Sequence, residues 1–91
     1  MNICYVPGLI SVIMPCFDAE AHLEESINSV LYQSYDEIEL IVIDDGSTDR
    51  SSEILDTFGG RITVISQKNI GPGPARNRGI ECANGEFIAF L

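Results

Sequence analysis

Four short apolar runs punctuate the chain, and each has the length and the Ile, Val and Leu content of a buried strand. They span residues 10–15, 38–45, 61–66 and 86–91. The first run ends at Pro15, which lacks the amide hydrogen that a strand ladder needs. Continuous apolar residues, rather than alternating ones, are typical of parallel strands that are buried on both faces. The pattern therefore predicts a mostly parallel sheet.

Helical periodicity fills the segments between these runs. Over residues 19–33, apolar side chains recur at i, i+4, i+7 and i+8 and predict one face of a helix, made of Leu23, Ile27, Val30 and Leu31. Asp18 is the expected N-cap of this helix, and Asp49 is the expected N-cap of a shorter one. Three side chains of the shorter helix should face the sheet before two glycines end it: Ile54, Leu55 and Phe58, followed by Gly59 and Gly60.

A third helix is predicted over residues 74–83, after a loop with two prolines and two glycines. Pro74 suits its first position, and Gly85 suits a left-handed residue that ends it. Strands that alternate with helices of this length specify an α/β fold, with right-handed crossovers between parallel strands. We therefore expect three layers, α/β/α, around one sheet.

Candidate chemistry lies where the second strand stops. The apolar run 40–43 gives way to Asp44 and Asp45, and a polar turn follows at residues 46–49. Open α/β sheets bind ligands at the carboxyl ends of their strands, so these carboxylates are candidates for recognition. Two alternatives stay open: a polar turn that only caps the next helix, or a Mg²⁺-holding carboxylate pair as in receiver-type signalling domains.

Length, charge and cysteine content narrow the function classes. With 91 residues the chain forms one domain at most, and its net charge of −9 argues against nucleic acid and anionic lipid as partners. Four of the five basic residues nevertheless lie between residues 61 and 78, where they could meet a small phosphorylated ligand: Arg61, Lys68, Arg76 and Arg78. Three cysteines without metal-ligand spacing indicate neither a disulfide framework nor a zinc site, which favours a reducing cytosol.

The common phosphate-binding loops are not found in the sequence. A dinucleotide fingerprint, GxGxxG, should follow the first strand directly, but Pro15, Cys16 and Phe17 stand there. The glycine-rich loop at residues 71–73 has Arg76 where the last glycine of that fingerprint belongs. A GxxxxGK[ST] loop is absent as well. Neither a classical dinucleotide domain nor a phosphate-binding-loop enzyme is therefore predicted.

Several motifs taken together resemble the family 2 glycosyltransferases. In chain order they are VIMPCFDAE at 12–20, SVLYQSY at 29–35, the segment 39–49, NIG at 69–71, ARNRG at 75–79 and GEFIAFL at 85–91. The resemblance covers nearly everything from Ile10 to Leu91. It implies a GT-A fold, of which residues 10–91 would be the Rossmann-like nucleotide-binding half of the domain, preceded by an N-terminal extension at residues 1–9.

The resemblance also implies a set of nucleotide-binding residues. Phe17, in the segment that begins at Pro15, would stack on the base, and Glu20 would lie near the base and ribose. Asp45 would accept a hydrogen bond from a uracil ring, with Asp44 as its partner at the site. Arg76 would lie near the diphosphate, with Lys68 and Asn69 as weaker candidates. Asp18 stands where the family most often has asparagine.

The remaining implications concern the whole enzyme. Family members continue into an Asp-x-Asp motif that holds Mg²⁺ or Mn²⁺, and then into an acceptor site with a general base, all beyond Leu91. We therefore expect no metal site or catalytic residue in this chain, and no transfer activity by the chain alone. The full enzyme would be a cytoplasmic, inverting transferase, at most bound to the cytosolic face of a membrane, that moves a sugar from a nucleoside diphosphate to a glycan acceptor. The alternative is an inactive truncated domain that self-associates through bare strand edges.

Overall fold

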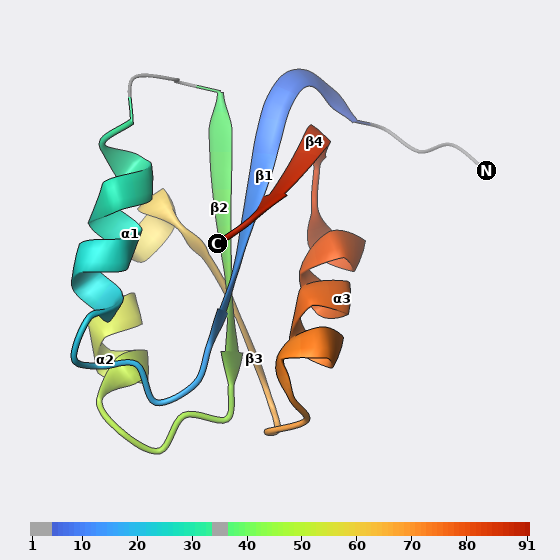
Figure 1. Cartoon of the computed structure of the whole chain (residues 1–91). Coiled ribbons are helices and arrows are strands. Elements are labelled where there is room, and N and C mark those ends of the chain that lie inside the picture. Colours follow the sequence, from blue (N-terminus) through green and yellow to red (C-terminus); the bar gives the residue numbers. More distant parts are fainter. Residues whose placement is uncertain (1–4, 34–36) are drawn as a thin grey trace.

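The computed structural model describes residues 5–33 and 37–91 and has three layers. In chain order its elements are β1 (Val6–Cys16), α1 (Leu23–Leu31), β2 (Ile38–Asp45), α2 (Ser51–Asp56), the 3₁₀ turn η1 (Gly59–Arg61), β3 (Thr63–Gln67), α3 (Pro72–Cys82) and β4 (Gly85–Phe90). The four strands form one sheet in the order β3-β2-β1-β4, and every neighbouring pair is parallel. Helices α1 and α2 cover one face and α3 covers the other (Figure 1). The predicted α/β/α architecture is confirmed.

Alternation along the two central strands builds a separate core on each face of the sheet. Even-numbered strand residues such as Val12, Met14 and Val42 pack in one cluster with side chains of α1 and α2. Odd-numbered residues pack in a second cluster with Ala75 of α3: Ile13, Ile41 and Ile43. Because successive side chains of a strand point to opposite faces, residue parity tells which layer each side chain meets. This parity also determines the site described below.

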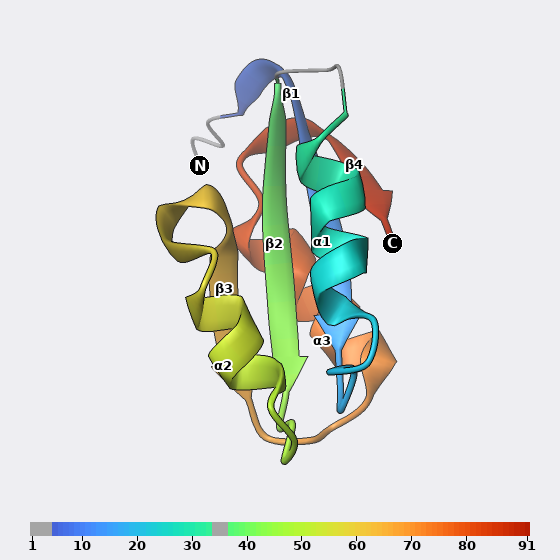
Figure 2. The same cartoon turned by 90° about the vertical axis from the view of Figure 1, so that its left-hand side faces the viewer.

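The connections at the carboxyl edge of the sheet diverge. The chain that leaves β1 turns to the face of α1, whereas the chain that leaves β3 passes beneath the end of β2 and reaches α3 on the opposite face (Figure 2). Strand order also reverses at β1, because β2 and β3 lie on one side of it and β4 on the other. Doubly wound sheets bind their ligands at this edge, between such diverging loops.

Two N-terminal boundaries differ from the sequence prediction. Strand β1 begins at Val6, four residues earlier than predicted, and its pairing with β4 is irregular between Val6 and Ile10. Helix α1 begins only at Leu23, with His22 at the N-cap position, so the prediction that Asp18 caps this helix is wrong. Asp18 has φ = 47° and its carboxylate accepts the amide of Thr48 at 2.7 Å. The Asp18 carboxylate is directed to the loop after β2 and not to the first turn of α1.

Two assignments around α3 are also corrected. Pro72, rather than Pro74, is the first residue of the helix. Gly85 is not a left-handed helix end but the first residue of β4, and a Cβ there would lie 2.7 Å from the carbonyl oxygen of Leu9. Gly85 therefore allows β4 to approach β1 closely.

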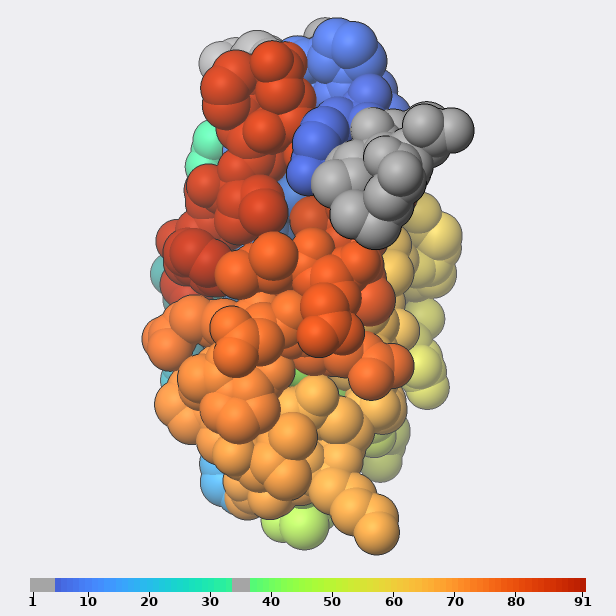
Figure 3. All heavy atoms as spheres, turned by 90° about the vertical axis from the view of Figure 1, so that its right-hand side faces the viewer, coloured from blue at the N-terminus to red at the C-terminus, as the bar shows by residue number. Residues whose placement is uncertain are grey.

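Helix α3 lies directly against the sheet. A Cβ at Gly79 would come within 2.4 Å of Cγ2 of Ile13, so a glycine is needed for this spacing. The space-filling view of this face shows α3 in front of the strands, with β4 beside its C-terminal end (Figure 3). No helix within residues 5–33 and 37–91 is long and apolar enough to cross a membrane.

Candidate functional site

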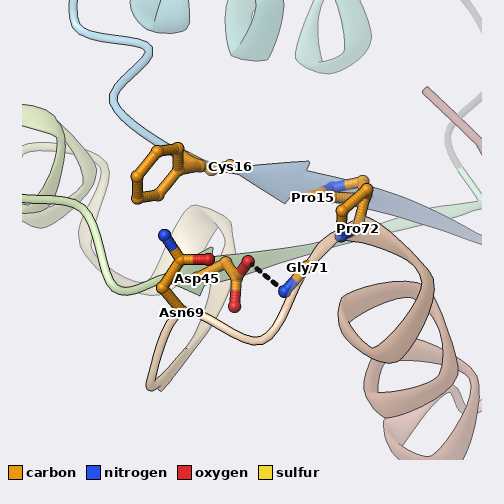
Figure 4. A pocket seen from close by; sticks show the side chains of 7 residues that line it. Pro15, Cys16, Asp45, Asn69, Gly71 and Pro72 are labelled. Atoms are coloured by element: carbon orange, nitrogen blue, oxygen red, sulfur yellow. Dashed lines mark hydrogen bonds between the residues drawn. The ribbon is translucent and has the colours of Figure 1, made fainter.

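A pocket of about 240 Å³ lies at the carboxyl edge of the sheet (Figure 4). Three separate segments line it: the end of β1, the end of β2 and the loop between β3 and α3, through Pro15, Cys16, Phe17, Asp45, Asn69, Gly71 and Pro72. Ligand pockets for whole drug-sized molecules measure roughly 300–1,000 Å³, so this one suits a ring-sized part of a larger ligand.

The Asp45 carboxylate is the charged group of the pocket. It is 3% exposed, yet it accepts three hydrogen bonds: Gln67 Nε2 and the Ile70 amide each donate to Oδ1 at 3.0 Å, and the Gly71 amide donates to Oδ2 at 2.9 Å. The bond from Gln67, followed by those from the two amides, holds the pKa of Asp45 below its usual range although burial opposes this. At neutral pH the pocket therefore presents an ionised acceptor.

Asp44 and Asp45 have different contacts, because neighbouring residues of a strand point to opposite faces of the sheet. Asp45 has the parity of the α3 face, and it meets the loop that leads into α3. Asp44 has the opposite parity, accepts the amide of Ser47 at 3.2 Å and is not among the lining residues. Asp44 thus closes the turn after β2, as the polar-turn alternative predicted for this cluster.

Backbone geometry after β2 brings the third segment close to Asp45. Gly46 has φ = 76°, and a Cβ there would lie 2.7 Å from the amide nitrogen of Asn69. A side chain at residue 46 would therefore push the loop between β3 and α3 away from Asp45. The glycine allows two loops to share one wall of the pocket.

Asp18 ties the loop after β1 to the loop after β2. Its amide donates to Ser47 Oγ at 3.0 Å, and its carboxylate accepts the amides of Thr48 and Asp49. Left-handed φ values in non-glycine residues favour Asn and Asp, so an aspartate here replaces an asparagine without loss of these acceptors. This link holds the segment that contains Phe17.

The side chains on the β1 wall are apolar or neutral. Phe17 is 48% exposed, so much of its ring is open to a ligand, and Pro15 is half-buried beside it in the chain. Burial raises the pKa of the Cys16 thiol, which keeps it protonated at neutral pH. This wall can stack against a flat ring but offers no ionised nucleophile.

Besides Asp44, three predicted residues are not brought to the pocket wall. Glu20 is exposed in the turn before α1, where its amide donates to Asp49. Lys68 and Arg76 are exposed on the loop after β3 and on α3. The pocket therefore collects Pro15, Phe17, Asp45 and Asn69 of the predicted set.

Sequence reasoning missed Gln67, Gly71 and Pro72. Gly71 and Pro72 belong to the segment that the sequence predicts as a loop before the third helix, and the motif NIG already contains Gly71. For Gln67 the signal was weaker, because only the pairing of β3 with β2 places it beside Asp45. Within residues 5–33 and 37–91 there is no group of three or more His, Cys, Asp or Glu side chains that could hold a metal ion. The described residues therefore do not fit a resident cation.

A four-stranded parallel sheet with helices on both faces and a pocket at its carboxyl edge defines the doubly wound class of α/β domains. The sequence pattern described as Glycosyl transferase family 2 matches residues 11–91. The chain therefore belongs to glycosyl transferase family 2.

Relatives and solved structures agree with this family. An uncharacterised glycosyltransferase of Haemophilus influenzae is 49% identical over 87 residues, which cover 91% of this chain and 35% of that protein. S. aureus TarS crystallised in complex with UDP-GlcNAc matches with a TM-score of 0.80 and 31% identity, over 91% of this chain and 26% of that one.

A third match is the glucosyl-3-phosphoglycerate synthase of Mycobacterium tuberculosis in complex with Mn²⁺, UDP and glucosyl-3-phosphoglycerate. It has a TM-score of 0.73 and 31% identity, over 91% of this chain and 32% of that one. These structures support nucleotide-sugar binding and a divalent metal in the family. The chain spans a quarter to about a third of the length of the curated relatives that it matches first.

Proposed function

We propose that this chain binds the nucleotide of a nucleoside-diphosphate sugar, with uridine as the nucleoside. The observation that carries the proposal is the ionised Asp45 carboxylate, which lies in a pocket with the exposed ring of Phe17. A carboxylate accepts a hydrogen bond from a ring N–H, and an aromatic face stacks on a base. Uracil offers both partners in a single ring through its ring N–H, whereas the ring nitrogens of adenine are acceptors and its N–H donors lie on the exocyclic amino group. UDP-bound structural neighbours support this choice of base.

The two basic candidates suit the diphosphate end of the ligand. Arg76 and Lys68 are exposed near the segments that carry Asn69 and Gly71, and both lie outside the wall of the base pocket. A diphosphate extends well beyond a ring-sized pocket, so cations at its margin fit the phosphates better than the base. Asp44 would then act indirectly, through the turn after β2 that its carboxylate closes.

For the whole protein we propose a cytosolic, inverting transfer of the sugar to a hydroxyl acceptor on a growing glycan. Such a transfer needs a general base and, in metal-dependent enzymes, a cation that offsets charge on the departing diphosphate. The described residues supply neither, so this chain alone should bind donor without transferring sugar. Mg²⁺ or Mn²⁺ would be held by residues outside this chain.

An amide NMR titration of the ¹⁵N-labelled chain with UDP tests the proposal. Saturable shifts of Phe17, Asp45 and Asn69 with UDP, and weaker ones with ADP, are the expected result. Asp45→Asn should lose UDP selectivity, because the amide nitrogen of asparagine cannot accept a hydrogen bond. Asp56→Asn, at an exposed position of α2, is the matched control and should bind as the unchanged chain does. Equal responses to UDP and ADP, or none to either, would refute uridine recognition by this pocket.

A second candidate function is self-association through β4. This strand is at the edge of the sheet, and three of its apolar side chains are exposed: Phe87 at 56%, Ile88 at 42% and Phe90 at 51%. An unpaired edge with exposed apolar residues is a template for pairing with another chain. Sedimentation velocity over a hundredfold range of protein concentration tests this candidate, because a sedimentation coefficient that stays at the monomer value would exclude self-association.

A further inference from the structure

Gln67 lies directly beside Asp45. It is the last residue of β3, and the register of β2 with β3 makes Asp45 and Gln67 partners across the sheet. Its Nε2 donates to Asp45 Oδ1 at 3.0 Å, and Gln67 itself is half-buried. The other two donors to this carboxylate, Ile70 and Gly71, are backbone amides. Of the three, the Gln67 bond is the one that a side-chain substitution removes.

Counting lone pairs shows which oxygen of Asp45 is left for a ligand. An ionised carboxylate offers about four acceptor sites, roughly two on each oxygen. Oδ1 receives both Gln67 Nε2 and the Ile70 amide, whereas Oδ2 receives the Gly71 amide. Oδ1 is therefore filled, and the remaining acceptor site is on Oδ2.

We propose that Gln67 is a positioning residue, which holds the Asp45 carboxylate so that Oδ2 presents its one free acceptor site to the ring N–H of the donor base. This inference rests on the proposed function. Without the Gln67 donor, Oδ1 regains a free site, and water or the base can bond it in a different geometry. The carboxylate then no longer favours a single position of the base, and discrimination between bases falls.

The acid–base behaviour of Asp45 supplies an independent readout. The bond from Gln67 is the largest cause that lowers the pKa of Asp45, ahead of the Ile70 and Gly71 amides. Asp44 on the same strand and Lys68 in the following loop are the ionisable groups next to this cluster along the chain. They are unchanged by a substitution at residue 67, so a rise of the Asp45 pKa reports the lost bond.

The test uses the 91-residue chain with Gln67→Met, Gln67→Lys and the matched control Gln33→Met, which changes an exposed glutamine after α1. Methionine keeps the length of the side chain without a donor, whereas lysine keeps an N–H donor. Affinity is measured by NMR titration with UDP and with UDP methylated at N3, which has no ring N–H. The carboxyl ¹³C shift of Asp45 is followed against pH in the same samples.

We expect Gln67→Met to bind UDP about tenfold more weakly, because a displaced Asp45 carboxylate loses its bond to the ring N–H, and tenfold is the usual scale for one hydrogen bond to a charged group. Its preference for UDP over the methylated nucleotide should shrink, and its Asp45 pKa should rise. Gln67→Lys and Gln33→Met should retain the affinity and the preference. A dispersed amide spectrum shows that each variant is folded.

Three results would overturn the inference in different ways. If the unchanged chain prefers UDP and Gln67→Met keeps both affinity and preference, Gln67 has no positioning role while the proposed function stands. If the unchanged chain shows no UDP preference, the proposed function fails and the role of Gln67 fails with it. A loss of affinity that is equal for UDP and its methylated form would also count against positioning, because it would reflect general damage to the pocket.

Discussion

Replacing Gly79 by alanine tests the close contact between α3 and the sheet. The added Cβ would lie 2.4 Å from Cγ2 of Ile13 and 3.1 Å from Cγ1. Carbon atoms prefer separations of about 3.5–4.0 Å, so the helix or the isoleucine must move by about 1 Å. Ile13 is completely buried on the central strand β1, where it packs with Ile41 and Ile43 and has little room to yield.

Overpacking of a core by one methyl group costs about 1–3 kcal/mol, whereas alanine gains about 0.5–1 kcal/mol over glycine inside a helix. The difference spans about 0–2.5 kcal/mol, and a contact of 2.4 Å with a fully buried side chain favours its upper part, a net destabilisation of about 1–2 kcal/mol. For a domain of this size, such a change lowers the melting temperature by about 4–16 °C. Loss of α3 packing would also move the loop that carries Gly71 and so weaken UDP binding.

Urea unfolding followed by circular dichroism measures the change in the free energy of unfolding. Gly73→Ala is the matched control on the same helix, because a Cβ there meets no atom within 4 Å. Since Pro74 follows it, the gain from alanine is small, and we expect a change within about 0.5 kcal/mol. Combined with Ile13→Ala, Gly79→Ala should cost less than it does alone, because the clashing atoms are gone. A Gly79→Ala protein as stable as the Gly73→Ala protein would refute the reasoning.

Two further predictions concern binding and acid stability. Phe17→Ala should weaken UDP binding about tenfold, since one base–aromatic stack contributes about 1–3 kcal/mol. Tyr32→Ala, which removes an exposed ring after α1, is the control and should not weaken binding. Calorimetric titration compares the two variants, and equal UDP affinities would show that Phe17 does not contact the base. Acid should destabilise the fold, because the pKa of Asp45 is lowered by Gln67 and two amides, and that of Glu39 is lowered, against burial, by bonds from Ser11 and Asn84. A carboxyl group whose pKa is lower in the folded than in the unfolded protein stabilises the fold at any pH above its unfolded-state pKa. This stabilisation is lost as the pH falls through the folded-state pKa. The urea midpoint should therefore stay constant from pH 7 to 5 and drop below about pH 4.3. A midpoint independent of pH down to 2.5 would contradict both assignments.

Periodicity and turn residues predicted the four strands and the three α-helices in the correct order, but not the 3₁₀ turn η1. Leu23, Ile27 and Val30 are buried as the helical spacing required, and Leu55 and Phe58 pack in the same core. Boundaries were less certain, because side chains at helix ends have competing partners. Asp18 bonds the loop after β2 instead of its own helix, and nothing local in the sequence distinguishes these two choices.

The amino-acid sequence was sufficient to predict the class of fold, the family and the edge of the sheet at which a ligand pocket forms. These depend on local patterns, namely the period of apolar residues and the residues that interrupt it. The folded structure was needed to show that Asp45, not Asp44, lines the pocket and that Gln67 lies beside Asp45. The reason is physical: which face of β2 meets α3, and which residue of β3 pairs with Asp45, depend on packing and strand register between segments that are distant in the chain.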